Sequence, residues 1–428
     1  MGEKRQDVLA GFRVIELGSY VAAPTAGRLL AAFGADVVKV EPPGRGDESR
    51  QWHTFGSETS LLWRSLGRGK RSVTIDLRTA AGRDLVLDLA KHSDIVLEGF
   101  RPGTLERLGL GPGVLAAANP DVILVRLSGF GQDGPYRDRA GFGSVAEAMG
   151  GIRFLTGYPD RPPVRVGIAL GDSMAGVYAA LGAVLALLGR ERGRRPGESG
   201  RDGQAETADA GLAGTVDGDP AETVDVALYE AVYSLLDSVV AEYDAFGAVR
   251  QRTGPTIAGV VPSNAYQCAD DGYVVIGANA DTVFARLAKA IGRPELSDDP
   301  RYAGASARGR AGDELDAIVG EWTRRHTQAE VMAAMADAGV PATPVYDAAD
   351  LAADPHLAAR AAHERHEVPV DGGTASVRFP APVPRLARGP ARPRWAGPDL
   401  GQHTREVLTE VLDLNDEELG RLAANGVI

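Results

Sequence analysis

Short apolar runs of strand length alternate with helical periodicities in the first part of the chain. The strand-like runs cover 13–19, 36–41, 72–77, 94–98 and 122–128. Helical periodicity covers 26–33, 80–92 and 104–110, with a turn of small residues expected at 21–24 and Gly34 as a helix stop. Strands that alternate with helices predict a doubly wound α/β domain, which would bind its ligand at the carboxyl ends of the strands.

A long helix is predicted directly after Asp172, because apolar residues recur at helical spacing from 177 to 188. Residues 197–220 contain few bulky apolar side chains, which predicts a flexible surface excursion. We expect the large domain to include 1–230, with that excursion as an insertion.

The rest of the chain predicts a smaller α+β domain and a return to the first. A linking helix to about residue 246, a strand at 273–277 and helices at 283–291, 312–325 and 328–338 place the small domain at 231–340. A hairpin with strands at 368–370 and 375–379 and a helix pair between 404 and 424 predict that 341–428 rejoins the large domain.

Composition narrows the possible partners and the compartment. The 428 residues carry a net charge of −12 with no basic block, which disfavours nucleic acid and anionic membranes as partners. Cys268 is the one cysteine, so no intrachain disulfide forms, and no Cys/His metal spacing is present. We find no signal segment and no apolar run of membrane length, so we expect a cytoplasmic protein.

Two interpretations of Asp172 follow from its place at the start of the long helix. Asp and Ser are preferred helix caps, so Asp172 and Ser173 are typical of a helix N-terminus. Alternatively, the helix dipole keeps the Asp172 carboxylate ionised, so that it attacks an acyl carbon as a nucleophile. The local sequence is compatible with both interpretations.

Loops beside the predicted strands carry glycines and cations that suit a phosphate-bearing ligand. Glycine allows close approach of the backbone, and Lys or Arg would pair with phosphates. Each cation alone is typical of a surface charge, but their common position beside strands of one domain favours binding. The four candidates are Lys70, Arg71, Arg101 and Arg107.

Motifs along nearly the whole chain resemble one known family. They stand in order at 13–18 with 23–24, then at 30–41, 44–47, 69–76, 96–103, 171–173 and 401–408. Together they resemble the class III CoA-transferases (the CaiB/BaiF type), which include formyl-CoA:oxalate and carnitine CoA-transferases. The resemblance implies a Rossmann-like large domain made from both chain ends, a smaller α+β domain, and an interlocked homodimer.

The resemblance also implies the site residues. Asp172 matches the nucleophile in the family's Gly-Asp-Ser motif. The family's coenzyme A contacts carry over to Val21, Ala22, Pro42, Gly67, Arg68, Gly69, Lys70, Gly99, Phe100, Arg101, Arg107, Ala140, Gly141, Phe142 and Gly143. The substrates implied are an acyl-CoA and a small carboxylic acid, with no metal and no redox cofactor.

Departures from the family pattern bear on the substrate. Val21 occupies the position where the formyl-CoA enzymes have a glutamine. The loop at 257–264 contains one glycine, whereas the formyl-CoA enzymes have a run of glycines there. Both departures argue against oxalate and formate. Similar proteins with a Gly-Asp-Ser motif use succinyl-CoA and dicarboxylates such as citramalate, and Arg153, Arg165 and Arg252 are candidates to bind a second carboxylate or are ordinary surface charges.

The sequence disfavours three alternatives to CoA transfer. An α-methylacyl-CoA racemase shares the implied fold but needs an acid/base pair, and no histidine lies between His92 and His326. A nicotinamide oxidoreductase would have G-x-G-x-x-G after the first strand, which residues 18–23 lack. A non-catalytic CoA-binding protein is disfavoured because Asp172 is retained.

Overall fold

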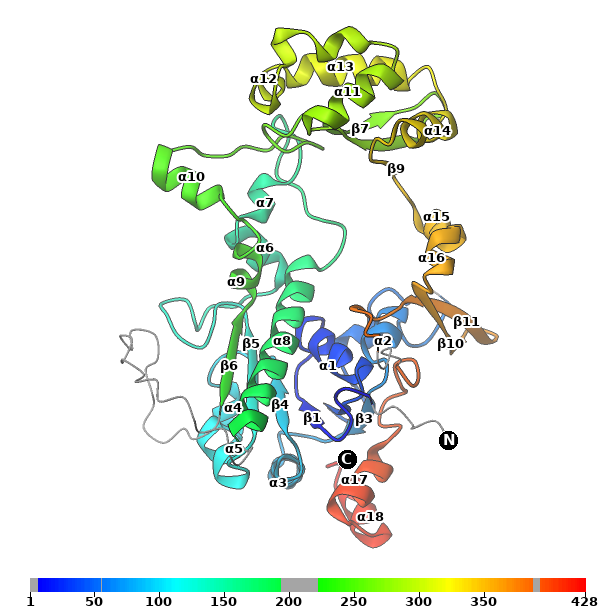
Figure 1. Cartoon of the computed structure of the whole chain (residues 1–428). Helices are drawn as coiled ribbons and strands as arrows, with labels where there is room; N and C mark the ends of the chain where they lie inside the picture. Colours follow the sequence, from blue (N-terminus) through cyan, green and yellow to red (C-terminus); the bar gives the residue numbers. More distant parts are fainter. Residues whose placement is uncertain (1–6, 55, 194–221, 388–392) are drawn as a thin grey trace. The chain divides into compact units, whose positions relative to one another are not determined.

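The computed structural model describes residues 7–54, 56–193, 222–387 and 393–428 and divides the chain into two compact units (Figure 1). The first unit consists of Met1–Ile152, Val166–Asp237 and Ala361–Ile428, and the second of Arg153–Arg165 and Ser238–Arg360. The expected small domain covered residues 231–340. The second unit of the structure instead runs from Ser238 to Arg360 and also includes Arg153–Arg165. The excursion expected at 197–220 lies outside the described residues.

A six-stranded parallel sheet forms the centre of the first unit, in the order β3-β2-β1-β4-β5-β6. The strands are β1 Arg13–Glu16, β2 Asp36–Glu41, β3 Arg71–Thr74, β4 Ile95–Glu98, β5 Ile123–Ser128 and β6 Thr223–Ala227. All five predicted strands and the α/β class are confirmed. Strand β6 was not predicted, because its first residues alternate between half-buried and exposed positions at the sheet edge.

Helices cover both faces of this sheet, as the doubly wound prediction requires. On one face, α1 and α8 pack on the core that contains Leu30, Ala179 and Leu187. On the other face, α3, α5 and α17 contribute Leu89, Leu115 and Val407. The helices of this unit are α1 Ala22–Ala32, α2 Leu61–Leu66, α3 Ala80–Lys91, α4 Thr104–Arg107, α5 Pro112–Ala118, α6 Gly143–Met149, α8 Leu170–Gly193, α9 Leu228–Tyr233, α17 Thr404–Leu412 and α18 Asp416–Ala424, with a short 3₁₀ helix η1 Glu48–Gln51.

Several helix boundaries differ from the sequence prediction, and two of the differences bear on the site. The expected turn at 21–24 is already helical from Ala22, because Pro24 falls in the first turn of α1, where no N–H partner is needed. Helix α8 begins at Leu170, so Asp172 is the third residue of the helix rather than its cap.

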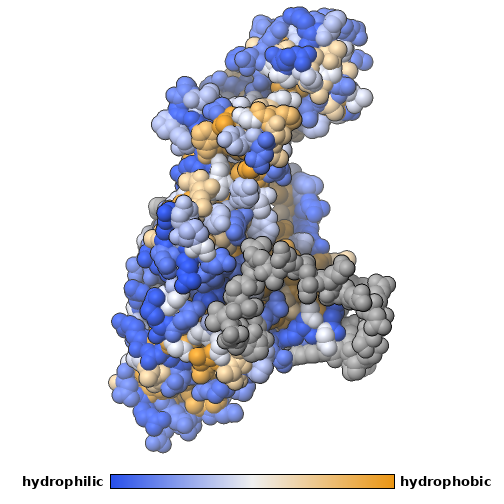
Figure 2. All heavy atoms as spheres, turned by 90° about the vertical axis from the view of Figure 1, so that its left-hand side faces the viewer, coloured by the Kyte–Doolittle hydropathy of each residue, from blue (hydrophilic) through white to orange (hydrophobic). Residues whose placement is uncertain are grey.

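Helix α8 buries several small residues and exposes several large apolar ones. Ala175, Ala179 and Ala183 have exposed fractions of 0%, whereas Leu181 and Leu185 are 50% and 59% exposed. Among the described residues, α8 is the one helix that is long and apolar enough to cross a membrane, which corrects the expectation that no such run exists. Its buried alanines pack in the core of the first unit. Figure 2 shows exposed hydrophobic residues, in orange, among hydrophilic ones on one face of the molecule.

The C-terminal residues of the first unit add an antiparallel hairpin, β10 His363–Val370 and β11 Gly373–Pro380, longer than predicted at both ends.

The second unit has its own core around Val274, Leu315 and Met335 and its own antiparallel sheet, β7 Ser263–Gln267, β8 Tyr273–Gly277 and β9 Ala342–Pro344. Its longer helices are α10 Val239–Phe246, α11 Asp281–Ala290, α13 Gly312–Thr323 and α14 Gln328–Ala338. The shorter ones are α7 Ile152–Leu155 at the boundary, α12 Ala305–Arg310, α15 Ala348–Ala353 and α16 Pro355–Ala359, with 3₁₀ turns η2 Pro294–Ser297 and η3 Pro300–Tyr302.

Candidate active site

The strand order reverses between β1 and β4, and loops from several strands meet at their carboxyl ends there. A Cβ atom added to Gly18, after β1, would lie 3.2 Å from the backbone nitrogen of Gly99, after β4. A Cβ on Gly129, after β5, would lie 2.8 Å from Cα of Gly141. Because these glycines have no side chains, the loops that carry them can pack closely against one another. The predicted CoA residues Gly99 and Gly141 therefore lie at the edge where a doubly wound sheet binds ligands.

Asp172 lies against the first residue of α6. A Cβ atom on Gly143 would be 1.9 Å from Oδ2 of Asp172, so no side chain fits there while the carboxylate keeps its position. The Asp172 side chain belongs to a half-buried residue in the first turn of α8. Helix N-termini carry partial positive charge and unpaired N–H groups, which favour a carboxylate anion.

Helix α8 crosses the start of α1 close to Asp172. A Cβ on Gly176 would lie 2.6 Å from the carbonyl oxygen of Ala22. Asp172 is four residues before Gly176, so both are on the same face of the helix, one turn apart. The structure therefore brings the predicted nucleophile to Gly143 and toward the predicted residues Val21 and Ala22.

Glu147 is a buried residue beside this site that the sequence did not indicate. Its side chain is on α6, one turn after Gly143, and Glu147 is 2% exposed. Its Oε1 accepts a hydrogen bond of 3.4 Å from the backbone N–H of Gly171, the residue before Asp172. Glu147 thus links α6 to the first turn of α8.

Three aromatic rings form a cluster next to Gly143. The Tyr20 ring centroid lies 5.6 Å from that of Phe142 and 5.5 Å from that of Trp52. Phe142 and Trp52 are 56% and 39% exposed, so the cluster borders solvent. Phe142 was a predicted CoA residue. Tyr20 and Trp52 were missed, since neither lies in a periodic segment.

Buried charges hold Tyr20 in an unusual backbone conformation. Tyr20 has φ +68°, a left-handed value uncommon for a non-glycine residue. Its N–H donates to Oδ1 of Asp47 (3.2 Å), while Oδ2 of Asp47 pairs with Nζ of Lys39 (2.8 Å). Burial disfavours the charged forms of Lys39 and Asp47, but the attraction between the two charges outweighs this effect. The pKa of Lys39 is therefore raised and the pKa of Asp47 is lowered. Lys39 also donates to the Gly18 carbonyl, so this pair fixes the turn after β1.

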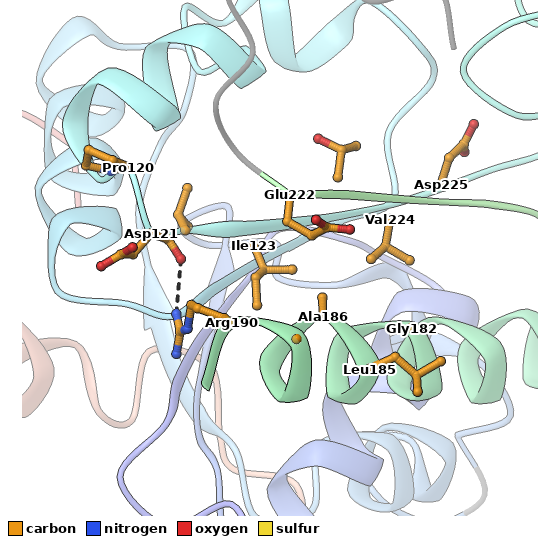
Figure 3. Close-up of a pocket in the computed structure, with 13 residues that line it drawn as sticks. Pro120, Asp121, Ile123, Gly182, Leu185, Ala186, Arg190, Glu222, Val224 and Asp225 are labelled. Carbon is orange, nitrogen blue, oxygen red and sulfur yellow. Dashed lines mark hydrogen bonds between the residues drawn. The ribbon is translucent and has the colours of Figure 1, made fainter. Parts of the chain in front are cut away.

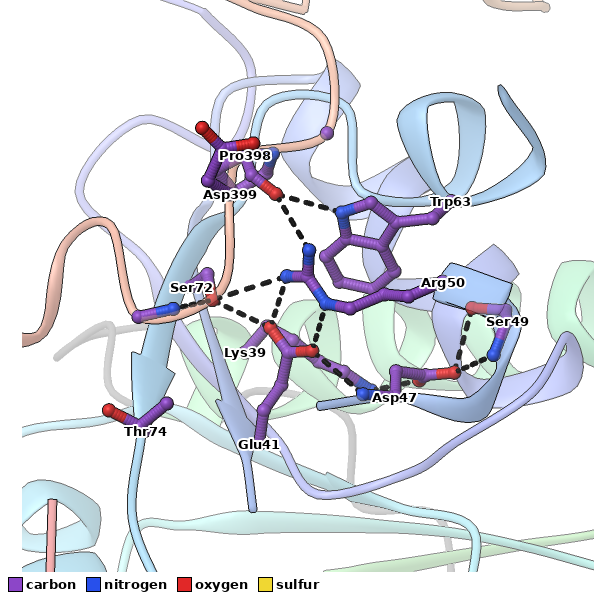
Figure 4. Close-up of polar contacts among 12 residues, drawn as sticks. Lys39, Glu41, Asp47, Ser49, Arg50, Trp63, Ser72, Thr74, Pro398 and Asp399 are labelled. Atoms are coloured by element: carbon purple, nitrogen blue, oxygen red, sulfur yellow. Dashed lines mark hydrogen bonds and ion pairs between the residues drawn. The ribbon is translucent and has the colours of Figure 1, made fainter. Parts of the chain in front are cut away.

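A second part of the same network joins β2 to the C-terminal segment (Figure 4). The Arg50 guanidinium donates two 2.7 Å hydrogen bonds to the Glu41 carboxylate and stacks 3.8 Å from the Trp63 ring. Arg50 and Trp63 both donate to the carbonyl oxygen of Pro398, at 3.1 and 2.8 Å. The loop that starts at the predicted residue Pro42 is therefore held by residues distant in sequence.

The 67–70 loop uses its cationic side chains inside the protein. Lys70 is 0% exposed, and its Nζ lies 2.6 Å from Glu16 and donates to the Pro24 carbonyl at 2.8 Å. Burial lowers the pKa of Lys70 to about 8. Arg68 pairs with Glu364 and donates to the Pro380 carbonyl, 2.9 Å away. The backbone of this loop is paired inside the protein as well, because the N–H groups of Gly67 and Gly69 donate to the carbonyls of Trp63 and Trp395 at 2.7 and 3.0 Å. The CoA contact of this loop stays a prediction.

Of the four predicted phosphate cations, two are directed into the protein and two are exposed. Arg71 is 7% exposed and pairs with Asp36 and Glu410. Arg101 and Arg107 are exposed, on the loop after β4 and on α4. Arg107 donates to the Thr104 hydroxyl at 2.8 Å. The loop after β4 is therefore the part of the predicted site with accessible cations.

A cavity of about 760 Å³ lies away from these residues, between the C-terminal half of α8 and the beginnings of β5 and β6 (Figure 3). It is lined by Leu185, Ala186 and Ile123, and Arg190 donates to the Asp121 carbonyl at 3.0 Å beside it. Parallel sheets bind ligands at the carboxyl ends of their strands. This cavity, at the amino ends, is not the candidate active site.

In the second unit, the loop at 257–264, which was compared above with the glycine run of the formyl-CoA enzymes, borders a cavity of about 700 Å³. Arg308, 1% exposed, donates to the carbonyls of Val261 and Asn279 at 3.3 and 2.7 Å and so fixes the end of this loop. Arg252 donates to the carbonyls of Phe154 and Tyr158 at 2.9 and 3.2 Å. Its guanidinium thus has a structural role.

Among the described residues, no group of three or more His, Cys, Asp or Glu side chains could hold a metal ion.

Comparison with known proteins matches residues 9–404 to the CoA-transferase family III. The succinyl-CoA–D-citramalate CoA-transferase of Chloroflexus aurantiacus is 47% identical over 419 residues, which cover 97% of each chain. The succinyl-CoA–L-malate CoA-transferase alpha subunit of the same organism is 38% identical, over 98% of this chain and 92% of the relative. A crystal structure of a CAIB/BAIF family protein from Brucella suis has a TM-score of 0.78 and 31% identity, over 95% of this chain and 100% of the other.

Proposed function

Because the chain belongs to the CoA-transferase family III, we propose that it moves CoA from succinyl-CoA to a free dicarboxylic acid through a covalent intermediate on Asp172. The observation that carries this proposal is the position of the Asp172 carboxylate. It lies in the first turn of α8, against the bare Cα of Gly143, where α6 begins. A carboxylate nucleophile needs a place where it stays ionised and where a carbonyl carbon can reach it.

The reaction consists of four acyl exchanges without a change of oxidation state. An Asp172 oxygen attacks the thioester carbon of the donor, which forms a mixed anhydride and releases the CoA thiolate. The thiolate attacks the Asp172 carbonyl carbon, frees the donor acid and leaves an aspartyl-CoA thioester. The acceptor carboxylate attacks that thioester to form a second anhydride, and the thiolate then attacks the acceptor's carbonyl, which yields the new acyl-CoA and regenerates Asp172.

Backbone N–H groups of the two helix starts supply the stabilisation that these steps need. Each attack places negative charge on a carbonyl oxygen, and fixed N–H donors stabilise such an oxyanion. The first residues of α6 and α8 have N–H groups without partners in their own helix. Glu147 supports this arrangement, because its hydrogen bond to the Gly171 N–H positions the residue before the nucleophile.

The substrate proposal rests on the relatives and on the loops of this chain. Two relatives are named for succinyl-CoA with citramalate or malate, which are hydroxylated dicarboxylates. We propose the same donor and a hydroxylated or branched dicarboxylate acceptor here. Val21, at the start of α1, offers no polar side chain toward an acyl group, in agreement with a substrate other than oxalate.

The geometry at Gly143 argues against the racemase alternative. Racemisation needs an acid and a base on the two sides of the α-carbon. The position that contacts Asp172 is a glycine, and residues 140–143 contain no titratable side chain. No acid/base partner for Asp172 comes from this segment.

The exposed face of α8 supports the proposal of a homodimer. Five large apolar residues on it are between 38% and 59% exposed: Val177, Leu181, Val184, Leu185 and Leu188. A contiguous apolar surface of this kind is typical of a protein interface. We propose that a second copy of the chain covers this face, in the interlocked arrangement that the family resemblance implies.

Substitution of the nucleophile and chemical trapping test the proposed reaction together. Asp172 is the half-buried third residue of α8 and not its cap, so Asp172→Asn should fold normally but lose transfer by orders of magnitude, because an amide cannot form the anhydride. In the unmodified protein, succinyl-CoA followed by hydroxylamine should convert Asp172 to a hydroxamate, detected by mass spectrometry of its peptide. Full activity of Asp172→Asn, or a hydroxamate on another carboxylate, would disprove the mechanism.

A further inference from the structure

A buried arginine is linked both to the end of β4 and to α4, beside the exposed Arg101 and Arg107. Arg126 is in β5 and pairs in register with Glu98, the last residue of β4. Its Nε donates to Oε1 of Glu98 at 2.7 Å, and the two side chains are 7% and 1% exposed. Because Arg126 is shielded from solvent, it cannot itself contact a ligand on the protein surface.

Arg126 also reaches the short helix that carries Arg107. Its Nη2 forms an ion pair of 2.9 Å with Oε1 of Glu106, in α4. One guanidinium therefore joins the end of β4 to α4, and these two elements flank the segment 99–103.

Glu98 extends this connection to the loop backbone. Its second oxygen, Oε2, accepts a 2.7 Å hydrogen bond from the N–H of Phe100. Burial raises the pKa of Glu98, and the charge of Arg126 opposes that shift. A buried carboxylate that loses its cation is strongly destabilised as an anion, so the hydrogen bond to Phe100 depends on Arg126.

We propose that Arg126 is a positioning residue for CoA, which fixes Arg101 and Arg107 in the arrangement that binds the phosphates of the coenzyme. This inference rests on the proposed function, since it assigns those two arginines to CoA. The physical reason is preorganisation. A loop held in its binding geometry loses less conformational entropy when the ligand binds.

The test measures CoA binding as well as transfer. Arg126→Gln should weaken binding of CoA, measured by calorimetry, by roughly 2- to 30-fold, the range for residues that act on a ligand through others. KM for the acyl-CoA donor should rise in parallel, while KM for the free acid and kcat stay unchanged. Arg126→Lys should recover part of the affinity. In an Arg101→Ala/Arg107→Ala background, Arg126→Gln should have no further effect on CoA binding.

Two further variants keep the test informative. If Arg126→Gln does not fold, the double variant Arg126→Met/Glu98→Gln removes both buried charges and should still weaken CoA binding, since the link to Glu106 is gone. Arg190→Gln is the matched control. Arg190 pairs with Asp94 at 2.6 Å and donates to the Asp121 carbonyl, so it joins the residues before β4 and β5 as Arg126 joins their other ends.

The outcomes separate this inference from the proposed function. Arg190→Gln should lower the melting temperature and leave CoA binding unchanged. Folded Arg126 variants that bind CoA as tightly as the unmodified protein would overturn the inference alone, as would an effect additive with loss of Arg101 and Arg107. An unmodified protein that does not bind CoA would overturn the proposed function and this inference with it.

Discussion

The carboxylate of Asp172 lies against the bare Cα of Gly143, so that a single added methyl group would fall 1.9 Å from Oδ2. This contact joins the first turn of α8 to the first residue of α6. It explains why a glycine stands at 143, and it defines the side from which an acyl group cannot approach.

Gly143→Ala should therefore displace the nucleophile. We expect kcat to fall on the order of 100-fold, since a misplacement of about 1 Å at a reacting group has that effect. Asp172 is near the surface and can rotate away, so the melting temperature should change little. Steady-state kinetics and a thermal melt measure both quantities.

The control for this substitution is Gly189→Ala, in the same long helix. An added Cβ at Gly189 meets no atom within 4 Å, so this variant should keep full activity and gain slight stability from the better helix former. Equal kcat for Gly143→Ala and Gly189→Ala would show that the contact with Asp172 is irrelevant to catalysis.

Arg101→Ala and Arg107→Ala should each weaken the binding of acyl-CoA donors. Both side chains are exposed beside the carboxyl end of β4, and loss of a charge-assisted hydrogen bond costs about 1.5–3 kcal/mol. KM should rise roughly 10- to 150-fold and by a similar factor for donors with different acyl groups, because the contact is to the coenzyme. Arg78→Ala, an exposed arginine paired with Asp76, should have no such effect. A change in KM confined to the free acid would contradict the assignment.

Lys70 should make folding stability depend on pH between about 8 and 10. Burial beside Lys39, offset only partly by Glu16, lowers its pKa from 10.5 to about 8 in the folded protein. Below pH 8 both states hold the proton. Above it the folded state releases the proton first, so the unfolded state binds more protons and stability rises with pH.

Comparison with Lys70→Met removes the contributions of titrating groups that do not interact with Lys70, because these cancel in the difference. The free energy of unfolding of the unmodified protein relative to Lys70→Met should increase by about 2 kcal/mol from pH 7.5 to 9.5. Urea unfolding at the two pH values measures it. Lys91→Met, at an exposed lysine paired with Asp88, should show no trend. A flat difference for Lys70→Met would mean that Lys70 keeps its proton over this range.

The exposed face of α8 should mediate dimerisation. Leu181→Glu/Leu185→Glu places two charges on residues that are 50% and 59% exposed in the single chain, so the chain should still fold. Light scattering should then give the monomer mass of 44.8 kDa in place of twice that value. Val114→Glu, at another exposed apolar residue, should leave the mass unchanged. A dimer that survives the double substitution would place the interface elsewhere.

Local sequence patterns were sufficient for most of the sheet. Strands such as 36–41 and 122–128 carry apolar residues on both faces, because both faces of a parallel sheet are buried, and their signal does not depend on distant residues. Strand β6 gave no such signal. It lies at an edge where alternate residues are exposed, so only its pairing with β5 makes it a strand.

The same distinction applies to the site. Motif order along the chain indicated the family and pointed to Asp172, and periodicity placed it at the start of a helix. Sequence could not show that α8 turns Ala175, Ala179 and Ala183 inward and Leu181, Leu185 and Leu188 outward, since both faces are apolar and only packing against α1 chooses between them.

Long-range contacts decided the roles of the charged residues. Lys70, Arg101 and Arg107 all follow the same pattern of cations beside strands. Yet Lys70, just before β3, is buried and pairs with Glu16 of β1, while the two arginines remain in solvent. Whether a cation pairs inside the protein or faces a ligand depends on which carboxylates the fold brings within about 3–4 Å, and that distance is a property of the tertiary structure alone.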